Sequence, residues 1–295
     1  MELKMENLSK NFKDVRAVNH ISYTMHNGVY GLLGLNGAGK TTLMRMLCTL
    51  IQPTEGGIFC NGQDIFAMGA EYRNLLGYLP QDFGYYPDFS VKDYLLYIAS
   101  IKGIKSVAAK KIVRELLRQV GLDKAENRKM KKLSGGMKRR AGIAQAMINN
   151  PKILILDEPT AGLDPGERIR FRNLVSKLSQ DRLVLLSTHI VSDIEYIAKD
   201  ILFMKEGAIL YAGSPENVRK ELPVKVWKIQ VSRSEINHFL QRYQVVNIKS
   251  LDNGAEMRIL SIEKPHINAV EEMATVEDAF LYYFGEKAGE EDVIL

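Results

Sequence analysis

A glycine-rich stretch near the start of the chain could bind a chain of phosphates. Residues 34–41, GLNGAGKT, match the full pattern G-x-x-x-x-G-K-[ST]. In such a loop, backbone N–H groups face phosphate oxygens where the loop enters a helix. The Lys40 ammonium could reach the outer phosphates, and the Thr41 hydroxyl could bind Mg²⁺. A glycine-rich turn without a ligand is the alternative. A strand-like segment before the stretch and an amphipathic helix after it favour a nucleotide site.

Two carboxylates follow a second apolar segment and could complete such a site. Asp157 and Glu158 lie at the end of the apolar run in ILILDEP, residues 153–159. Open α/β sheets bind ligands at the carboxyl ends of their strands, so both side chains should lie near the glycine-rich loop. Asp157 could hold magnesium, and Glu158 could take a proton from an attacking water. A helix-capping acid pair is the alternative, which the upstream motif makes the weaker interpretation.

Three further residues are candidates. His189 follows LLST at the end of another apolar strand, where a polar group could sense a terminal phosphate. Gln81, in YLPQD, would ordinarily be a surface residue of a loop, and only the other motifs make it a candidate. Phe12 precedes the glycine-rich loop and could either stack on adenine or belong to the core.

A second anion-binding pattern occurs at residues 133–140, LSGGMKRR. Ser134 can cap a helix, and Gly135 and Gly136 leave its first turn without side chains. No second lysine loop, acid pair or histidine accompanies this pattern. We therefore expect it to complete a nucleotide site on a different chain, so that two chains facing head to tail would form two sites.

The spacing of apolar residues predicts the elements that position these residues. Strands are expected over 3–12, 17–25 and 28–34, followed by a helix from Gly39 to about Ile51 and another strand at GIFC. Residues 152–156 and 182–188 are continuous apolar runs with a helix between them, which indicates a right-handed crossover in a parallel sheet. Residues 200–213 are expected to form a hairpin. Five residues should form one face of the first helix: Leu43, Met46, Leu47, Leu50 and Ile51.

Residues 85–150 are expected to be helical, and residues after Pro223 to form a separate small unit. One helix should run through 106–120, with Val107, Ile112, Val113, Leu116, Leu117 and Val120 in one stripe. A second should occupy 137–150. In the C-terminal region, strands are expected at 224–231 and 255–262, with helices at 236–243 and 275–284. The expected domains are therefore 1–222 and 223–295, the second a small α+β domain.

The composition limits the class of protein. The chain has 295 residues, of which 46% are hydrophobic and 25% charged, as is ordinary for a soluble protein with a sizeable core. No apolar run approaches the ~20 residues that a membrane helix needs, and Cys48 and Cys60 are too few for a disulfide scaffold. The net charge of +5 favours an anionic partner. The basic residues around 128–140 could be a solvated face or a patch for phosphate or lipid.

Together, the motifs resemble those of the nucleotide-binding subunits of ABC transporters. The resemblance covers residues 1–220 and six motifs in the family's order. GLNGAGKTT resembles Walker A, YLPQD the Q-loop, LSGGM the signature, ILILDEP Walker B, AGLD (161–164) the D-loop and STH the switch histidine. The fifth signature residue is often glutamine and here is Met137, while the anion-binding Ser134 and Gly136 are present.

The resemblance implies an α/β fold with a RecA-like P-loop NTPase core, a helical signature subdomain at about 85–150 and an ATP-sandwich dimer. It implies catalytic roles for Glu158, His189, Gln81 and Lys40, and Mg²⁺ binding by Thr41, Gln81 and Asp157. It implies nucleotide contacts from Phe12, Asn36, Gly37, Ala38, Gly39, Lys40, Thr41, Thr42, Ser134, Gly135, Gly136 and Asp164.

The expected partners are a second cassette, identical or closely related, and membrane-spanning permease subunits that dock near the Q-loop. The expected location is the cytoplasmic face of a bacterial cell membrane, with ATP and Mg²⁺ as cofactors and no direct contact with nucleic acid. Met137 followed by KRR, and TVEDAFLYYFG near the C-terminus, resemble ATPases of bacterial antibiotic and peptide export.

Three other functions fit parts of the sequence. A soluble ABC ATPase acting on ribosomes or DNA would resemble tandem cassettes or carry long coiled coils, whereas this chain has one motif set and no sustained heptads. A P-loop phosphotransferase would not need Ser134–Gly136 or the acid and histidine. A regulator that binds nucleotide without turnover is disfavoured by the presence of Glu158.

Overall fold

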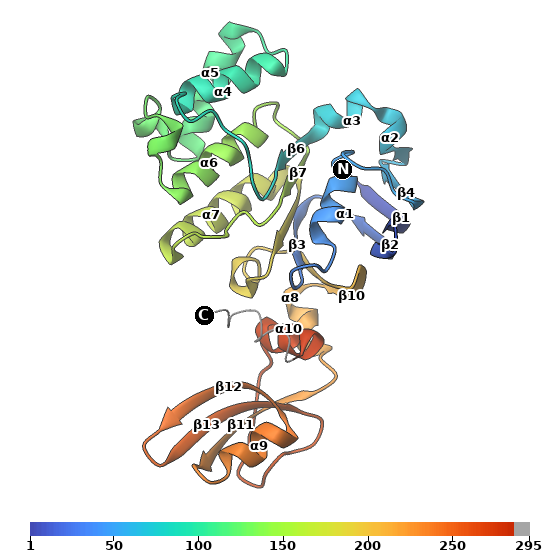
Figure 1. The fold of residues 1–295 in the computed structure, drawn as a ribbon, viewed down its shortest axis with the longest axis vertical. Helices are drawn as coiled ribbons and strands as arrows, with labels where there is room; N and C mark the ends of the chain where they lie inside the picture. The colour runs from blue at the N-terminus through green and yellow to red at the C-terminus, as the bar shows by residue number, and fades with distance from the viewer. Residues whose placement is uncertain (286–295) are drawn as a thin grey trace. The chain divides into compact units, whose positions relative to one another are not determined.

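The computed structural model describes residues 1–285 of the chain (Figure 1). The chain divides into two compact units, Met1–Ile209 and Leu210–Leu295. The domain boundary expected after Leu222 follows the first helix of the second unit and stays a prediction. No helix within the described part combines the length and the apolar character that crossing a membrane requires.

The N-terminal sheet of the first unit is antiparallel and four-stranded, in the order β2-β1-β4-β5. Its strands are β1 (Leu3–Phe12), β2 (Val15–Met25), β4 (Glu55–Cys60) and β5 (Gln63–Asp64). The strands expected in these segments are confirmed. Alternate residues of β1, such as Leu3 and Met5, are fully buried, because one face of this sheet packs on the core.

The second sheet is six-stranded, in the order β10-β9-β3-β8-β7-β6. Its strands are β3 (Gly28–Leu33), β6 (Leu76–Leu79), β7 (Ile153–Leu156), β8 (Leu183–Thr188), β9 (Asp200–Lys205) and β10 (Ala208–Gly213). β6, β7, β8, β3 and β9 pair in parallel. The expected parallel strands are confirmed, and their carboxyl ends bring the sequence motifs to one edge of the sheet.

The helix after the glycine-rich loop is shorter than expected. α1 spans Lys40–Leu47 and does not reach Ile51. Thr49 has a φ of 56°, and the Leu50 N–H donates to the Arg45 carbonyl at 2.9 Å, so the backbone closes the helix in a left-handed turn. Leu50 is consequently 60% exposed, and its expected place on the apolar face of this helix is wrong.

Three helices form the helical subdomain at one side of the first unit, next to β6 (Figure 1). They are α4 (Val91–Ile101), α5 (Ser106–Gln119) and α6 (Gly135–Ala146). Val113, Leu116 and Leu117 of α5 are buried as expected, but Val107 in its first turn is 86% exposed, so this part of the expected stripe is wrong. The start of α6 thus lies near the carboxyl ends of the parallel strands, where Gly135 borders the same hollow as Gln81 and Ala161.

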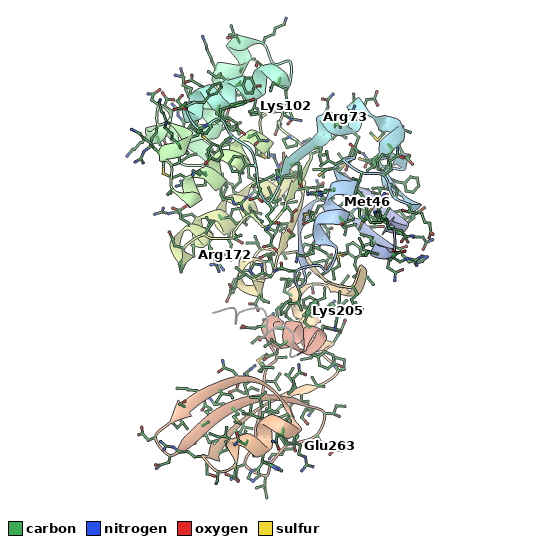
Figure 2. The ribbon with its side chains drawn as sticks, viewed as in Figure 1. Met46, Arg73, Lys102, Arg172, Lys205 and Glu263 are labelled. Atoms are coloured by element: carbon green, nitrogen blue, oxygen red, sulfur yellow. The ribbon has the colours of Figure 1, made fainter. Side chains whose placement is uncertain are left out.

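The remaining helices of the first unit lie on the two sheets. They are α2 (Ile65–Met68), α3 (Ala70–Leu75) and α7 (Pro165–Leu178), with 3₁₀ turns at Asp123–Ala125, Met130–Lys132, Ser179–Asp181 and Val191–Asp193. α7 connects the parallel strands β7 and β8, as expected. The main core joins residues of both sheets with those of α1, and Met46, labelled in Figure 2, lies fully buried in it.

The second unit contains a four-stranded antiparallel sheet in the order β12-β13-β11-β14. Its elements are α8 (Pro215–Lys220), β11 (Lys225–Ser232), α9 (Ile236–Arg242), β12 (Gln244–Leu251), β13 (Gly254–Ser261), β14 (Val270–Glu272) and α10 (Val276–Phe284). The expected elements are confirmed, and α8, β12 and β14 are additional. Trp227, Ile229 and Phe239 belong to a core between α9 and the sheet.

Candidate functional site

The glycine-rich loop connects β3 to α1 and has a backbone that needs glycine. Gly39 precedes α1 with a φ of 101°, and a Cβ atom there would lie 2.2 Å from the carbonyl oxygen of Ala17. No other residue fits this position without moving the backbone. The loop therefore brings its own N–H groups, rather than side chains, to the start of the helix.

Lys40 lies behind this loop and is 6% exposed. Its ammonium donates hydrogen bonds to the carbonyl oxygens of Gly34, at 2.6 Å, and Leu35, at 3.1 Å. It also lies 3.8 Å from Glu158 Oε1. A buried ammonium held by carbonyl oxygens next to the N–H groups of the loop is suited to bind an anion there.

Asp157 and Glu158 follow β7 directly and are almost completely buried. The Ser187 hydroxyl donates to Asp157 Oδ1 at 2.7 Å and accepts from the Glu158 N–H at 2.9 Å. Glu158 has a φ of 44°, in the left-handed region that a glutamate rarely adopts. The Ser187 hydroxyl on β8 thus holds both acidic residues in place and supports the left-handed backbone at Glu158.

His189 follows β8 and lies beside Glu158. Its Nδ1 is 3.2 Å from Glu158 Oε2, so the two side chains predicted to act on a terminal phosphate are in contact. Lys40, Glu158 and His189 therefore converge at the carboxyl ends of three parallel strands, although they lie far apart in the sequence.

A cavity of about 490 Å³ opens over the loop. Of the expected site residues, those on its walls are Asn36, Gly37, Ala38, Gly39, Lys40, Thr41, Thr42, Gln81 and Glu158. Phe12 is not among the lining residues; it is 46% exposed at the end of β1, with the Lys10 ammonium 5.2 Å from its ring centroid. Its expected stacking on adenine stays a prediction.

The signature residues lie outside this cavity. Ser134 caps α6 by accepting a hydrogen bond from the Met137 N–H at 3.2 Å, and Asp164 caps α7 by accepting one from the Glu167 N–H at 2.8 Å. Gly136 packs against Glu167, where a Cβ atom would lie 2.9 Å from the glutamate side chain. Gly135 lines a separate hollow of about 220 Å³, which Gln81 also borders. The signature and the D-loop are thus joined, but no signature residue lines the Lys40 cavity.

Several residues of the site were not predicted. Ser187 belongs to the STH motif, but no role was predicted for it. Val15, Arg16 and Ala17 of β2 line the cavity, together with Glu206 and Gly207. The Ser187 hydroxyl could have been inferred, because a polar residue at the end of a buried strand needs a partner. The β2 and β9–β10 residues carry no such signal, because only the folding of both sheets brings them to the loop.

The polar groups of the site are suited to bind a nucleotide together with Mg²⁺. Within residues 1–285, Asp157 Oδ2 and Glu158 Oε1 are buried and have no hydrogen-bond partner. Carboxylate, hydroxyl and amide oxygens, as on Asp157, Thr41 and Gln81, are ligands that Mg²⁺ accepts. The loop and Lys40 supply the N–H groups and charge for phosphates, so the fold and site define a P-loop nucleotide-binding protein.

Comparison with known proteins gives the family. Residues 18–161 match the ABC transporter family. The ABC transporter ATP-binding protein YxlF of Bacillus subtilis, described as uncharacterized, is 34% identical over 230 residues, which are 78% of this chain and 76% of that protein. The Nod factor export ATP-binding protein I of Burkholderia orbicola is 31% identical over 294 residues, covering 96% and 97% of the two chains.

Solved structures agree with this assignment. An ATP-binding subunit of an ABC transporter superposes with a TM-score of 0.67 and 25% identity, over 75% of this chain and 93% of the other. The CbiO1 protein of Clostridium perfringens, part of the ABC transporter complex CbiONQ, superposes with a TM-score of 0.69 and 26% identity, over 81% and 94%. The chain belongs to the ABC transporter ATP-binding proteins, and it is an ATPase that powers transport.

Proposed function

We propose that this ATPase drives export through separate membrane-spanning subunits, as one half of an ATP-sandwich dimer. The observation that carries the catalytic part is the convergence of Lys40, Glu158 and His189 at one edge of the parallel sheet. The antibiotic, peptide or lipid-like cargo is proposed from the export relatives and from the resemblance at Met137–Arg140.

Each polar group of the site has a role in this proposal. The loop N–H groups and Lys40 hold the β- and γ-phosphates of ATP. Thr41, Gln81 and Asp157 would hold Mg²⁺, which neutralises charge on the phosphates when it is bound. Glu158 accepts the proton of the attacking water. His189, 3.2 Å away, orients that carboxylate and faces the terminal phosphate.

The second half of the nucleotide site comes from a partner chain. The N-terminus of α6 carries a capping serine and two glycines, which can bind a phosphate through N–H groups and the helix dipole. Since Ser134, Gly135 and Gly136 do not line their own chain's Lys40 cavity, we assign them to the γ-phosphate of a second cassette. Asp164, adjacent to them through Glu167, would lie in the same interface.

Export is favoured over import by the relatives that align over nearly the whole chain. The Burkholderia Nod factor export protein covers 96% of this chain, including the second unit. In this proposal the protein binds a permease on the cytoplasmic face of a bacterial cell membrane. The permease subunits contribute the path for the cargo, and the ATPase contributes the two nucleotide sites.

The direction of transport can be tested in membrane vesicles. The chain would be coexpressed with the membrane proteins encoded beside its gene, and ATP-dependent accumulation of a fluorescent amphipathic drug and of a labelled lipooligosaccharide would be measured. An exporter accumulates cargo in inside-out vesicles, where the ATPase faces the external ATP. Accumulation restricted to right-side-out vesicles loaded with ATP would refute export. A copy with Lys40→Ala is the control for ATP dependence.

A further inference from the structure

The segment that carries Gln81 contacts α6, the helix that begins at the signature, at both of the segment's ends and in its middle. This connector, residues 81–85, leads from β6 toward α4. In the middle of α6, Gly142 leaves room for both β6 and the connector, since a Cβ atom there would lie 2.7 Å from Leu79 Cδ1 of β6 and 3.1 Å from Phe83 Cε1 of the connector. Close packing of this kind prevents the connector and the helix from sliding past one another.

Two adjacent cationic side chains of α6 hold the connector at its ends. Arg139 Nη1 donates to the Gln81 carbonyl oxygen at 2.6 Å. The Lys138 ammonium lies 5.2 Å from the centroid of the Tyr85 ring, within range of a cation–π interaction. The connector is therefore bound at its first and last residues by neighbouring positions of one helix turn.

The Arg139 side chain is partly buried. Burial lowers its pKa, while the carboxylates of Asp82, Glu158 and Asp157 act in the opposite direction. Arginine remains protonated in proteins, so the side chain stays a charged donor. A charged donor with a short bond to a carbonyl is a strong restraint on that peptide unit.

We propose that Arg139 is a positioning residue, which fixes Gln81 through its backbone carbonyl and links its position to that of Ser134. Ser134 caps the same helix five residues earlier, so a rotation of α6 toward a partner's nucleotide carries Gln81 with it. This inference rests on the role proposed above for Gln81.

The test uses the full-length protein and four variants. Arg139→Met removes the donors and keeps the length of the side chain, Arg139→Lys keeps the charge, and Gln81→Ala removes the group being positioned. Arg114→Met, at an exposed arginine on α5, is the matched control. The measurements are kcat and KM for ATP, the affinity for a non-hydrolysable ATP analogue, and amide hydrogen exchange in peptides covering 78–90.

We expect Arg139→Met to lower kcat about tenfold, the effect of losing one charged hydrogen bond. KM and analogue affinity should change less than twofold, and exchange over 81–85 should accelerate. Arg139→Lys should restore at least half of kcat. In the Gln81→Ala background, Arg139→Met should cause no further loss, since the two residues would act as a unit.

The outcomes separate this inference from the proposed function. Equal, additive losses from Gln81→Ala and Arg139→Met would overturn the linkage while leaving a role for Gln81. A wild-type kcat for Gln81→Ala would refute the role of the glutamine itself. Faster exchange with unchanged kcat would show that Arg139 only stabilises the loop, which also overturns the proposal.

Discussion

Replacing Glu158 by glutamine should separate ATP binding from ATP hydrolysis. The carboxylate is 6% exposed, lies 3.2 Å from His189 Nδ1 and 3.8 Å from Lys40 Nζ, and has one oxygen without a hydrogen-bond partner in the described chain. Glutamine has nearly the same shape, so the cavity should not change. Its amide cannot accept a proton from water at neutral pH, so only the general-base step should be lost.

The size of the effect follows from that role. A positioned general base contributes roughly 10²–10⁴ in rate, which corresponds to about 3–5 kcal/mol of barrier. ATP affinity should stay the same or increase, because one negative charge near the phosphates is removed. Phosphate release in a single-turnover assay and retention of labelled ATP measure the two effects. Glu71→Gln, at an exposed glutamate on α3, should behave like the wild type.

The same variant tests the signature residues. Retained ATP should hold two cassettes together, and light scattering with ATP and Mg²⁺ should detect a dimer. The N-terminus of α6 contributes up to about 2 kcal/mol through its dipole, and Ser134→Arg places a bulky side chain there. Adding this substitution should abolish the dimer and leave ATP retention by the chain's own loop intact.

Two results would refute this reasoning. Hydrolysis by Glu158→Gln at the wild-type rate would exclude Glu158 as the general base. A dimer that forms equally well with arginine at position 134 would show that the signature does not bind the partner's nucleotide.

Three further predictions concern the phosphate loop and the second unit. Lys40→Ala should weaken binding of ATP with Mg²⁺ by at least about tenfold while circular dichroism stays unchanged, because the outer phosphates lose their buried cation; unchanged affinity in a nucleotide titration would show that the phosphates lie elsewhere. A chain ending at Leu222 should fold and bind ATP, since every motif precedes that residue; a product without a cooperative unfolding transition would show that the boundary is wrong. Asp278→Asn should destabilise the second unit by about 3 kcal/mol, measured by the fluorescence of Trp227, the single tryptophan of the chain. Burial raises the pKa of Asp278, but hydrogen bonds from Arg258 and Thr275 outweigh it and hold the pKa below its ordinary value of 3.8. This stabilisation should be complete above about pH 4 and be lost as the pH falls through the lower folded pKa. Asp278→Asn should remove that pH dependence, and a variant that retained it would contradict the assignment.

The sequence allowed the central residues to be predicted because they follow strands. Asp157, Glu158 and His189 come directly after continuous apolar runs, and such runs are typical of buried parallel strands. Parallel strands place their carboxyl ends together, and in the structure Glu158 and His189, which follow β7 and β8, are in contact there. The glycine-rich loop could also be predicted from the sequence, because it matches the full phosphate-loop pattern. The structure shows why Gly39 is needed, since its backbone leaves no room for a side chain.

The predictions failed where the backbone conformation, or the pairing of strands distant in the sequence, determined the structure and the spacing of apolar residues did not. Leu50 continues the apolar period of α1, but the left-handed Thr49 ends the helix before it. β12 was missed because most of its residues are exposed and do not alternate with buried ones. Its pairing with β13 comes from the tertiary structure, which the residues of Gln244–Leu251 do not encode by themselves.

The left-handed backbone at Glu158 affects the outcome of laboratory selection for thermostability. A glutamate held at a φ of 44° costs on the order of 1 kcal/mol relative to a relaxed backbone. Asparagine tolerates that conformation better. A laboratory screen for heat resistance alone would therefore favour substitutions of Glu158. The substitutions that such a screen favours would remove the carboxylate, so thermostability and turnover would be selected in opposite directions at one residue. Screens on this protein should therefore keep residue 158 fixed and look for stability elsewhere.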